Sequence, residues 1–149
     1  MKFIILVFSI FFAFSSCQKD TVYADQNIKK PRTNEQSLMV ESLFYDIGKM
    51  AESIWMNCQI FGNENTETFY VDYENKVLVM RKTGIKNITI GVTKSNNVLN
   101  LLGYPDELEN ESKFIYKKND KDNEYLISLY FSKSGILTNI VYNVCGIIE

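Results

Sequence analysis

Residues 35–58, EQSLMVESLFYDIGKMAESIWMNC, decide the fold of this chain. Apolar residues recur in this stretch at intervals of three and four, with charged and amide side chains between them. This spacing predicts a long amphipathic helix whose apolar stripe packs on a core; a partner-binding face is the alternative. Thr33 and Gln36 have the spacing of a capping box at its start, and Gly62 provides a stop. The stripe consists of Leu43, Phe44, Ile47, Met50, Ala51, Ile54, Trp55 and Cys58.

After Gly62 the hydrophobic period changes to two, which is the period of β-strands. Residues 69–73 and 77–80 have this pattern, and Glu74-Asn75 lies between them. Two such segments joined by so short a polar link predict a β-hairpin.

A second, shorter helix is expected after a brief strand at residues 88–90. Thr93 stands at the position of an N-cap, Val98 and three leucines follow it, and Gly103 comes just before Pro105. A capping residue, an apolar run and a Gly-x-Pro exit are typical of a short helix. We expect Thr93 to cap this helix.

The last third of the chain predicts a three-stranded meander. Residues 114–118, 125–132 and 136–144 alternate in polarity, and polar turns at 119–123 and 132–135 separate them. The expected fold class is therefore α+β. A long N-terminal amphipathic helix and a short helix pack on an antiparallel sheet of about five strands.

The N-terminal end differs in composition from the rest of the chain. Five of the ten Phe residues fall within residues 1–17, and residues 3–14 form an apolar run behind Lys2. A membrane-spanning helix needs about 20 apolar residues, so this run has the length of a secretory signal peptide. We expect a signal peptide (1–16), a tether (17–35) and a single α+β domain (36–149).

The segment Phe14-Ser15-Ser16-Cys17 resembles the lipobox of a bacterial lipoprotein signal peptide. That box has an apolar residue, two small residues and the cysteine that becomes the lipidated first residue of the mature chain. The resemblance implies that Cys17 carries diacylglycerol and an N-acyl chain such as palmitate, which anchor the protein to a membrane. An ordinary signal peptide cut elsewhere, with Cys17 as an incidental thiol, is the alternative.

The residues after Cys17 bear on which membrane holds the anchor. In the lipoprotein family an Asp directly after the lipidated cysteine indicates inner-membrane retention, and this chain has Gln18 there. The resemblance therefore implies a lipid-anchored protein of the outer membrane. Gln18-Lys19-Asp20 is also similar to an export signal for the cell surface, so both the periplasmic face and the surface stay open.

Residues 18–35 are poor in hydrophobic side chains and include the basic cluster Lys29-Lys30-Pro31-Arg32. This composition cannot bury enough surface to offset chain entropy, so we expect a flexible tether with an r.m.s. span of about 25 Å. The cluster could contact anionic lipid, or it could simply be solvated.

Residues 88–105, ITIGVTKSNNVLNLLGYP, together with the meander, resemble the SmpA/OmlA domain of BamE-like outer-membrane lipoproteins. That domain shares its outline with the β-lactamase-inhibitor-protein fold. A Gly before a capped helix, a Val in that helix, a Leu-Gly-x-Pro exit and antiparallel strands carry the resemblance, which covers residues 85–144. It implies an α+β layout and action by binding other proteins, and it implies no particular binding residue.

Cys58 and Cys145 are the thiols that remain after Cys17. An exported protein can form disulfides, and these two residues end the long helix and the last strand, so a bridge between them is one expectation. Two separately buried thiols are the other, because the sequence does not give the Cα separation.

The composition also argues against several kinds of site. The chain has no His, which removes Ser–His and Cys–His catalysis and His-ligated metals. A net charge of −2 without a basic-aromatic array argues against nucleic acid as a partner. We expect no cofactor and no metal, because residues 120–124 lack the Gly and the distal Glu of a calcium loop and fall where the strand pattern requires a turn.

Five tyrosines fall in or near the expected strands: Tyr70, Tyr104, Tyr116, Tyr130 and Tyr142. A tyrosine-bearing sheet face could bind protein or glycan, or the rings could cover the sheet with their hydroxyls in water.

We therefore expect a non-enzymatic envelope lipoprotein whose domain binds another protein, in assembly, inhibition or immunity. A lipoprotein that binds a small ligand or glycan on the open face of its sheet is the alternative. A hydrolase that uses carboxylates, with Asp106 or Glu107 as candidates, is the third hypothesis.

Overall fold

The long helix α1 spans Asn34–Phe61 in a computed structural model that describes residues 30–146. The capping box is formed as predicted, because Thr33 Oγ1 accepts a hydrogen bond from the Gln36 amide and Gln36 Oε1 accepts one from the Thr33 amide. At the other end the Gly62 N–H donates to the Cys58 carbonyl at 2.8 Å. The predicted stripe faces the core, with Met50 and Ile54 only partly buried and Val40 buried in addition. The predicted signal peptide (1–16), Cys17 and the tether up to residue 29 lie outside the described residues.

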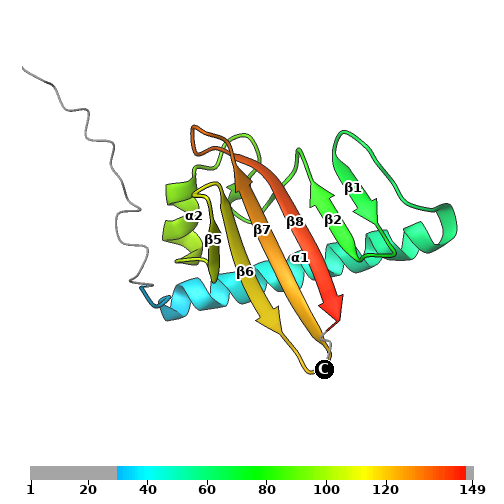
Figure 1. Ribbon diagram of the computed structural model, residues 1–149, viewed down its shortest axis with the longest axis horizontal. Coiled ribbons are helices and arrows are strands. Elements are labelled where there is room, and N and C mark those ends of the chain that lie inside the picture. The colour runs from blue at the N-terminus through cyan, green and yellow to red at the C-terminus, as the bar shows by residue number, and fades with distance from the viewer. Residues whose placement is uncertain (1–29, 147–149) are drawn as a thin grey trace, which may run out of the picture.

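Six strands form one antiparallel sheet on which α1 packs (Figure 1), in the order β1-β2-β8-β7-β6-β5. The predicted hairpin and meander are both present. The last strand of the meander pairs with the second strand of the hairpin, which joins the two into one sheet. The strands are β1 Phe69–Asp72, β2 Val77–Met80, β5 Glu107–Glu109, β6 Lys113–Asn119, β7 Asn123–Phe131 and β8 Leu137–Gly146, and a separate pair consists of β3 Gly84–Ile85 and β4 Ile88–Thr89. The α+β fold class is thus confirmed, and β3 and the edge strand β5 are additions to the predicted set.

The short helix α2 spans Ser95–Leu102 and differs at its start from the prediction. Lys94 is its N-cap and makes no side-chain cap hydrogen bond, so the prediction that Thr93 caps this helix is wrong. The Thr93 hydroxyl instead accepts a hydrogen bond from the Thr89 amide at 2.7 Å. A hydroxyl near a helix start has more than one backbone N–H within reach, and the Thr93 hydroxyl bonds the N–H of Thr89 at the end of β4 instead of one in the helix. Gly103 closes the helix as expected, with its N–H on the Leu99 carbonyl at 2.9 Å.

The core lies between α1, α2 and one face of the sheet. Cross-strand neighbours on this face form continuous apolar rows, such as Leu78, Tyr142 and Ile127 on β2, β8 and β7. The Trp55 ring of α1 stacks on Tyr142 with ring centroids 6.0 Å apart. Helix and sheet are therefore fixed to each other by side chains that are almost completely removed from water.

Both edges of the sheet are protected against further strand pairing. The segment before β1 returns along its outer edge, where the Val71 amide donates to the Glu64 carbonyl and the Tyr73 amide donates to Asn63 Oδ1. The other edge strand, β5, is short and carries two exposed glutamates. Short, charged or covered edges are the usual defence against strand addition, so pairing of a further strand at either edge is disfavoured.

The folded part of the chain includes the last residues of the predicted 17–35 tether. Arg32 Nη2 pairs with Asp106 Oδ2 at 3.0 Å, and Arg32 Nε donates to the Tyr104 carbonyl at 3.0 Å. The Arg32 guanidinium also lies 5.1 Å from the centroid of the Tyr116 ring. These three contacts fix the chain two residues before α1 begins, so Arg32 of the basic cluster is engaged within the domain.

Candidate functional site

The sheet face opposite α1, which we call the open face, carries a group of apolar side chains with Ser128 and Asn143 among them. No other described helix or strand covers it (Figure 1). Val79 and Val141 are cross-strand neighbours at its centre, and most of the group is partly exposed, with Ile115 buried among its neighbours. The group consists of Tyr70, Val77, Val79, Ile115, Leu126, Tyr130 and Val141.

Charged side chains border the open face along β5 and β6. Lys117 Nζ lies 2.5 Å from Glu107 and 3.8 Å from Glu124, and Lys113 Nζ lies 3.0 Å from Glu109. These carboxylates raise the pKa of both lysines, chiefly through side-chain hydrogen bonds, so the lysines stay charged at neutral pH. An apolar centre with a charged border is the arrangement of a protein–protein interface.

One polar atom at the centre of the open face lacks a hydrogen-bond partner. Asn143 lies between Val77 and Leu126 in the cross-strand row, and its Oδ1 is buried and accepts no hydrogen bond from the described residues. Buried side-chain oxygens nearly always have a partner, so Oδ1 is a candidate acceptor for a donor on a bound molecule.

Cys58 and Cys145 are both free thiols in the structure. Cys58 is buried in the core at the end of α1, and burial raises the pKa of its thiol. Cys145 is partly exposed and pairs with Glu124 in the β7–β8 ladder. The Cys58–Cys145 bridge is therefore not formed in the structure, and of the two thiols only Cys58 has the buried environment that the alternative expected for both.

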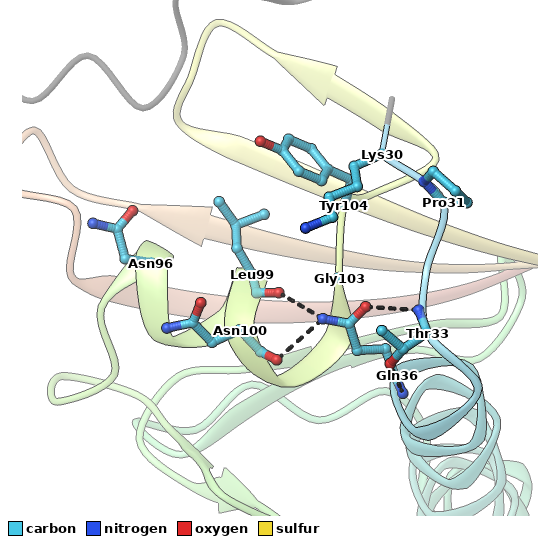
Figure 2. A pocket seen from close by; sticks show the side chains of 9 residues that line it. All are labelled: Lys30, Pro31, Thr33, Gln36, Asn96, Leu99, Asn100, Gly103 and Tyr104. Carbon is cyan, nitrogen blue, oxygen red and sulfur yellow. Dashed lines mark hydrogen bonds between the residues drawn. The ribbon is translucent and has the colours of Figure 1, made fainter. Parts of the chain in front are cut away.

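A cavity of about 390 Å³ lies where the chain enters the domain, between the start of α1 and the end of α2 (Figure 2). Gln36 holds its floor together: Nε2 donates to the Asn100 carbonyl at 3.2 Å and to the Leu99 carbonyl at 3.5 Å. The same side chain completes the capping box, so every polar atom of its amide is already used. We therefore interpret this cavity as the space left where the two helices meet, and not as a binding site.

Two further cavities adjoin on the α1 side of the sheet, and together we call them the helix–strand groove. Their volumes are about 410 and 420 Å³, and Glu52, Tyr125 and Tyr142 line both. Tyr45 and Lys49 of α1 line the first cavity, which ends at the β6–β7 turn. The second cavity extends past Trp55 to the β1–β2 turn and is lined there by Lys76.

Lysines and carboxylates balance within the helix–strand groove. Lys118 pairs with Glu41 at 2.5 Å. Lys76 Nζ lies 5.5 Å from the Trp55 ring centroid and 3.4 Å from that of Tyr73. The Tyr125 hydroxyl donates to Asp120 at 2.6 Å; this hydrogen bond and two from backbone amides hold the pKa of the Asp120 carboxyl below its usual range.

The deepest polar groups of the groove are a phenol and an indole. Burial raises the pKa of Tyr142 to about 12, so its hydroxyl remains protonated at any physiological pH. Trp55 is 8% exposed, and its indole N–H is buried without a hydrogen-bond partner among the described residues. No pattern in the sequence indicated this site, because its residues come from α1, from three strands and from two separate turns.

The carboxylates proposed for a hydrolase are engaged in structural contacts. Asp106 pairs with Arg32, and its Oδ2 also accepts the Lys117 amide hydrogen bond at 2.8 Å. Glu107 is exposed on β5 and pairs with Lys117. Within residues 30–146 no group of three or more acidic or cysteine side chains could hold a metal ion.

The five tyrosines divide between the two faces of the sheet. Tyr116 and Tyr142 are buried on the α1 side, and the Tyr116 hydroxyl donates to the Gly103 carbonyl at 2.9 Å. Tyr70 and Tyr130 lie on the open face, and Tyr104 is an exposed residue of the loop after α2. The sequence therefore identified two of the open-face residues and one residue of the groove.

None of the helices in the described part of the chain is long and apolar enough to cross a bilayer. No protein-family model, no curated protein and no solved structure matches the chain. The resemblance to the SmpA/OmlA domain therefore stays a prediction.

Proposed function

We propose that this protein is a non-enzymatic envelope lipoprotein, anchored at the outer membrane through Cys17, whose α+β domain binds another protein through its open face. The observation that carries the proposal is the uncovered apolar group on the open face with its border of lysine–glutamate pairs. An apolar sheet face that no other described element covers is a candidate interaction site.

The chemistry of the open face defines the partner. Its centre offers valine, leucine and tyrosine side chains with one unpaired amide oxygen, at Asn143. A matching partner surface is flat, apolar at its centre and able to donate one hydrogen bond there. At its margin it places polar groups against the paired charges of β5 and β6.

Pairing of a partner strand with the sheet edge is disfavoured. One edge is covered by residues 63–66 and the other is the short, acidic β5. The α+β layout also agrees with what the SmpA/OmlA resemblance implies. The same resemblance implies action by binding other proteins, which supports a role in assembly, inhibition or immunity.

Charge substitutions at the centre of the open face test the proposal. Val79→Glu combined with Val141→Glu places two carboxylates in the apolar centre, and Val92→Glu is the matched control on an exposed loop residue. Each variant is crosslinked in intact membranes and purified with its partners. We expect a stoichiometric partner with the parent chain and with the control, and at least tenfold less with the double variant.

Folding of the variants is followed by the fluorescence of Trp55, the single tryptophan. Leu126→Glu, tested alone, provides an independent probe if the double variant unfolds. Recovery of the same partner at the same yield with Leu126→Glu would contradict binding through the open face, and so would the repeated absence of any stoichiometric partner.

The anchor is tested separately. Cys17→Ala should abolish labelling by radioactive lipid precursors and release the protein from membranes, because several acyl chains provide the attachment. Membrane retention of Cys17→Ala without lipid would contradict the lipoprotein assignment.

A further inference from the structure

We propose that the helix–strand groove between α1 and the turns at one end of the sheet is a binding site for a neutral oligosaccharide. The groove is formed by residues on the α1 side of the sheet, so it is separate from the open face. Its argument does not depend on the proposed protein partner.

The size and continuity of the groove fit an elongated ligand. Each of its two cavities falls within the range of small-molecule sites, about 300–1,000 Å³. Glu52, Tyr125 and Tyr142 line both, so a ligand in one cavity continues into the other past the same three side chains. Two adjoining cavities suit a short chain of rings better than a single compact molecule.

Gly48 of α1 lines the first cavity. A Cβ at this position would lie 3.2 Å from the Tyr142 hydroxyl oxygen, which is closer than ordinary van der Waals contact. A glycine in the middle of a helix costs about 1 kcal/mol relative to alanine, so its presence requires a local reason. The missing side chain lets α1 approach the hydroxyl of Tyr142, a residue that lines both cavities.

The balance of charge selects a neutral ligand. Three lysines line the groove (Lys49, Lys76 and Lys118), and three carboxylates line it as well (Glu52, Glu74 and Asp120). Neither an anion nor a cation would gain from the groove as a whole. Lysines and carboxylates side by side instead supply both donors and acceptors, which is what the hydroxyl groups of a sugar require.

The aromatic side chains supply the apolar part of sugar recognition. Tyr45 of α1 is 61% exposed, and Tyr125 of β7 lines the same cavity. Tyrosine rings can pack on the C–H face of a pyranose, because the side chain has an apolar body and a polar tip. The Tyr125 hydroxyl donates to Asp120 and keeps its acceptor capacity for a sugar hydroxyl.

Two polar groups in the groove are available to a ligand. Glu52 makes no ion pair or hydrogen bond with the described residues, and it lies where the two cavities meet. The buried Trp55 N–H lacks an acceptor, although indole N–H groups normally have one when buried. A sugar hydroxyl can donate to Glu52, and another can accept from Trp55 once it reaches the second cavity.

The test uses the full chain purified from membranes in detergent. An array of neutral and acidic linear oligosaccharides is screened first, and neutral ligands that bind are titrated while the fluorescence of Trp55 is followed. Glu52→Gln removes the charged acceptor without changing the size of the side chain, and Glu67→Gln is the matched control, because Glu67 is exposed and outside the groove. Trp55→Phe, measured by calorimetry, removes the N–H and retains an aromatic ring.

We expect saturable binding of at least one neutral oligosaccharide, with a larger dissociation constant for its monosaccharide. Glu52→Gln should weaken this binding about tenfold, which is the size expected for a hydrogen bond to a charged group, and Glu67→Gln should leave it unchanged. The proposal is overturned if no neutral oligosaccharide on the array binds, if only acidic ones bind, or if both Gln variants bind equally well.

Discussion

Gly103 and Gly62 close the two helices with almost the same backbone conformation, and this makes them a matched pair for mutation. Gly103 has φ 73° and ψ −173°, and Gly62 has φ 84° and ψ 178°. Both lie in the region that is essentially restricted to glycine, and both donate the N–H that ends the helix. Alanine at either site therefore carries the same backbone cost, about 1–3 kcal/mol of unfolding free energy.

Only Gly103 lies against other parts of the fold. A Cβ there would be 2.8 Å from Arg32 Cγ and 2.8 Å from Gln36 Oε1, whereas a Cβ at Gly62 meets nothing within 4 Å. Relief of this contact displaces Gln36, which makes three hydrogen bonds: two join the start of α1 to the end of α2, and the third completes the capping box of α1. At about 0.5–1.5 kcal/mol each, their loss adds about 2–4 kcal/mol to the cost of Gly103→Ala.

Urea unfolding followed by Trp55 fluorescence measures the difference. Trp55 is 8% exposed and stacks on Tyr142, so its emission reports on the packing of α1 against the sheet. We expect Gly103→Ala to lower the free energy of unfolding by about 2–4 kcal/mol more than Gly62→Ala does. Equal losses in the two variants would refute the reasoning, because they would show that the contacts around Gly103 do not contribute to stability.

Three further predictions concern single side chains. Arg32→Met should lower the free energy of unfolding by about 1–2 kcal/mol, because its ion pair is partly buried and is joined by a hydrogen bond and a ring contact. Lys82→Met removes a largely exposed ion pair and should cost less than about 0.5 kcal/mol in the same urea assay. Burial raises the pKa of Tyr142 to about 12 in the folded state, so the unfolded state loses the Tyr142 proton at a lower pH. The free energy of unfolding should therefore fall as the pH rises from about 10 toward 12. An equally steep fall in the Tyr142→Phe variant would contradict this origin. A thiol reagent added to the native protein should modify Cys145 before Cys58, because Cys58 is 6% exposed and its thiol pKa is raised. Mass spectrometry maps the modified residue. If the two cysteines were bridged, neither would react.

The sequence predicted those elements whose signal is local. The capping box at Thr33 and the stop at Gly62 frame α1, and each is an interaction between residues only a few positions apart. The β1–β2 hairpin and the meander are likewise connected by short turns, so the period-two pattern was sufficient to recognise them.

The elements that the sequence did not predict depend on distant partners. The sequence of β5 is acidic and has no strand pattern of its own. It is a strand because Glu107–Glu109 pairs with β6, and the pairing begins where the Asp106 amide donates to the Ile115 carbonyl. The insertion of β8 between β2 and β7 also has no local signal, because any exposed edge would satisfy its alternating pattern.

The candidate sites were predictable only in part. The sequence located tyrosines on the strands, and the register then placed Tyr130 on the open face and Tyr142 toward α1. The helix–strand groove combines positions such as Glu52 and Asp120 that lie far apart in the chain, and no spacing rule connects them. Such a site is recognisable only when the packing of the helix on the sheet is known.

The contacts of Arg32 also determine how the domain bears a mechanical load. A force applied through the chain before Lys30 reaches the fold at Arg32, where an ion pair, a hydrogen bond and a ring contact resist it in parallel. The load passes from Arg32 to Asp106, whose Oδ2 also accepts the Lys117 amide hydrogen bond from the middle of β6, and so enters the sheet. Tension is therefore transmitted to the six-stranded sheet, and the first turn of α1 is not the element that carries it.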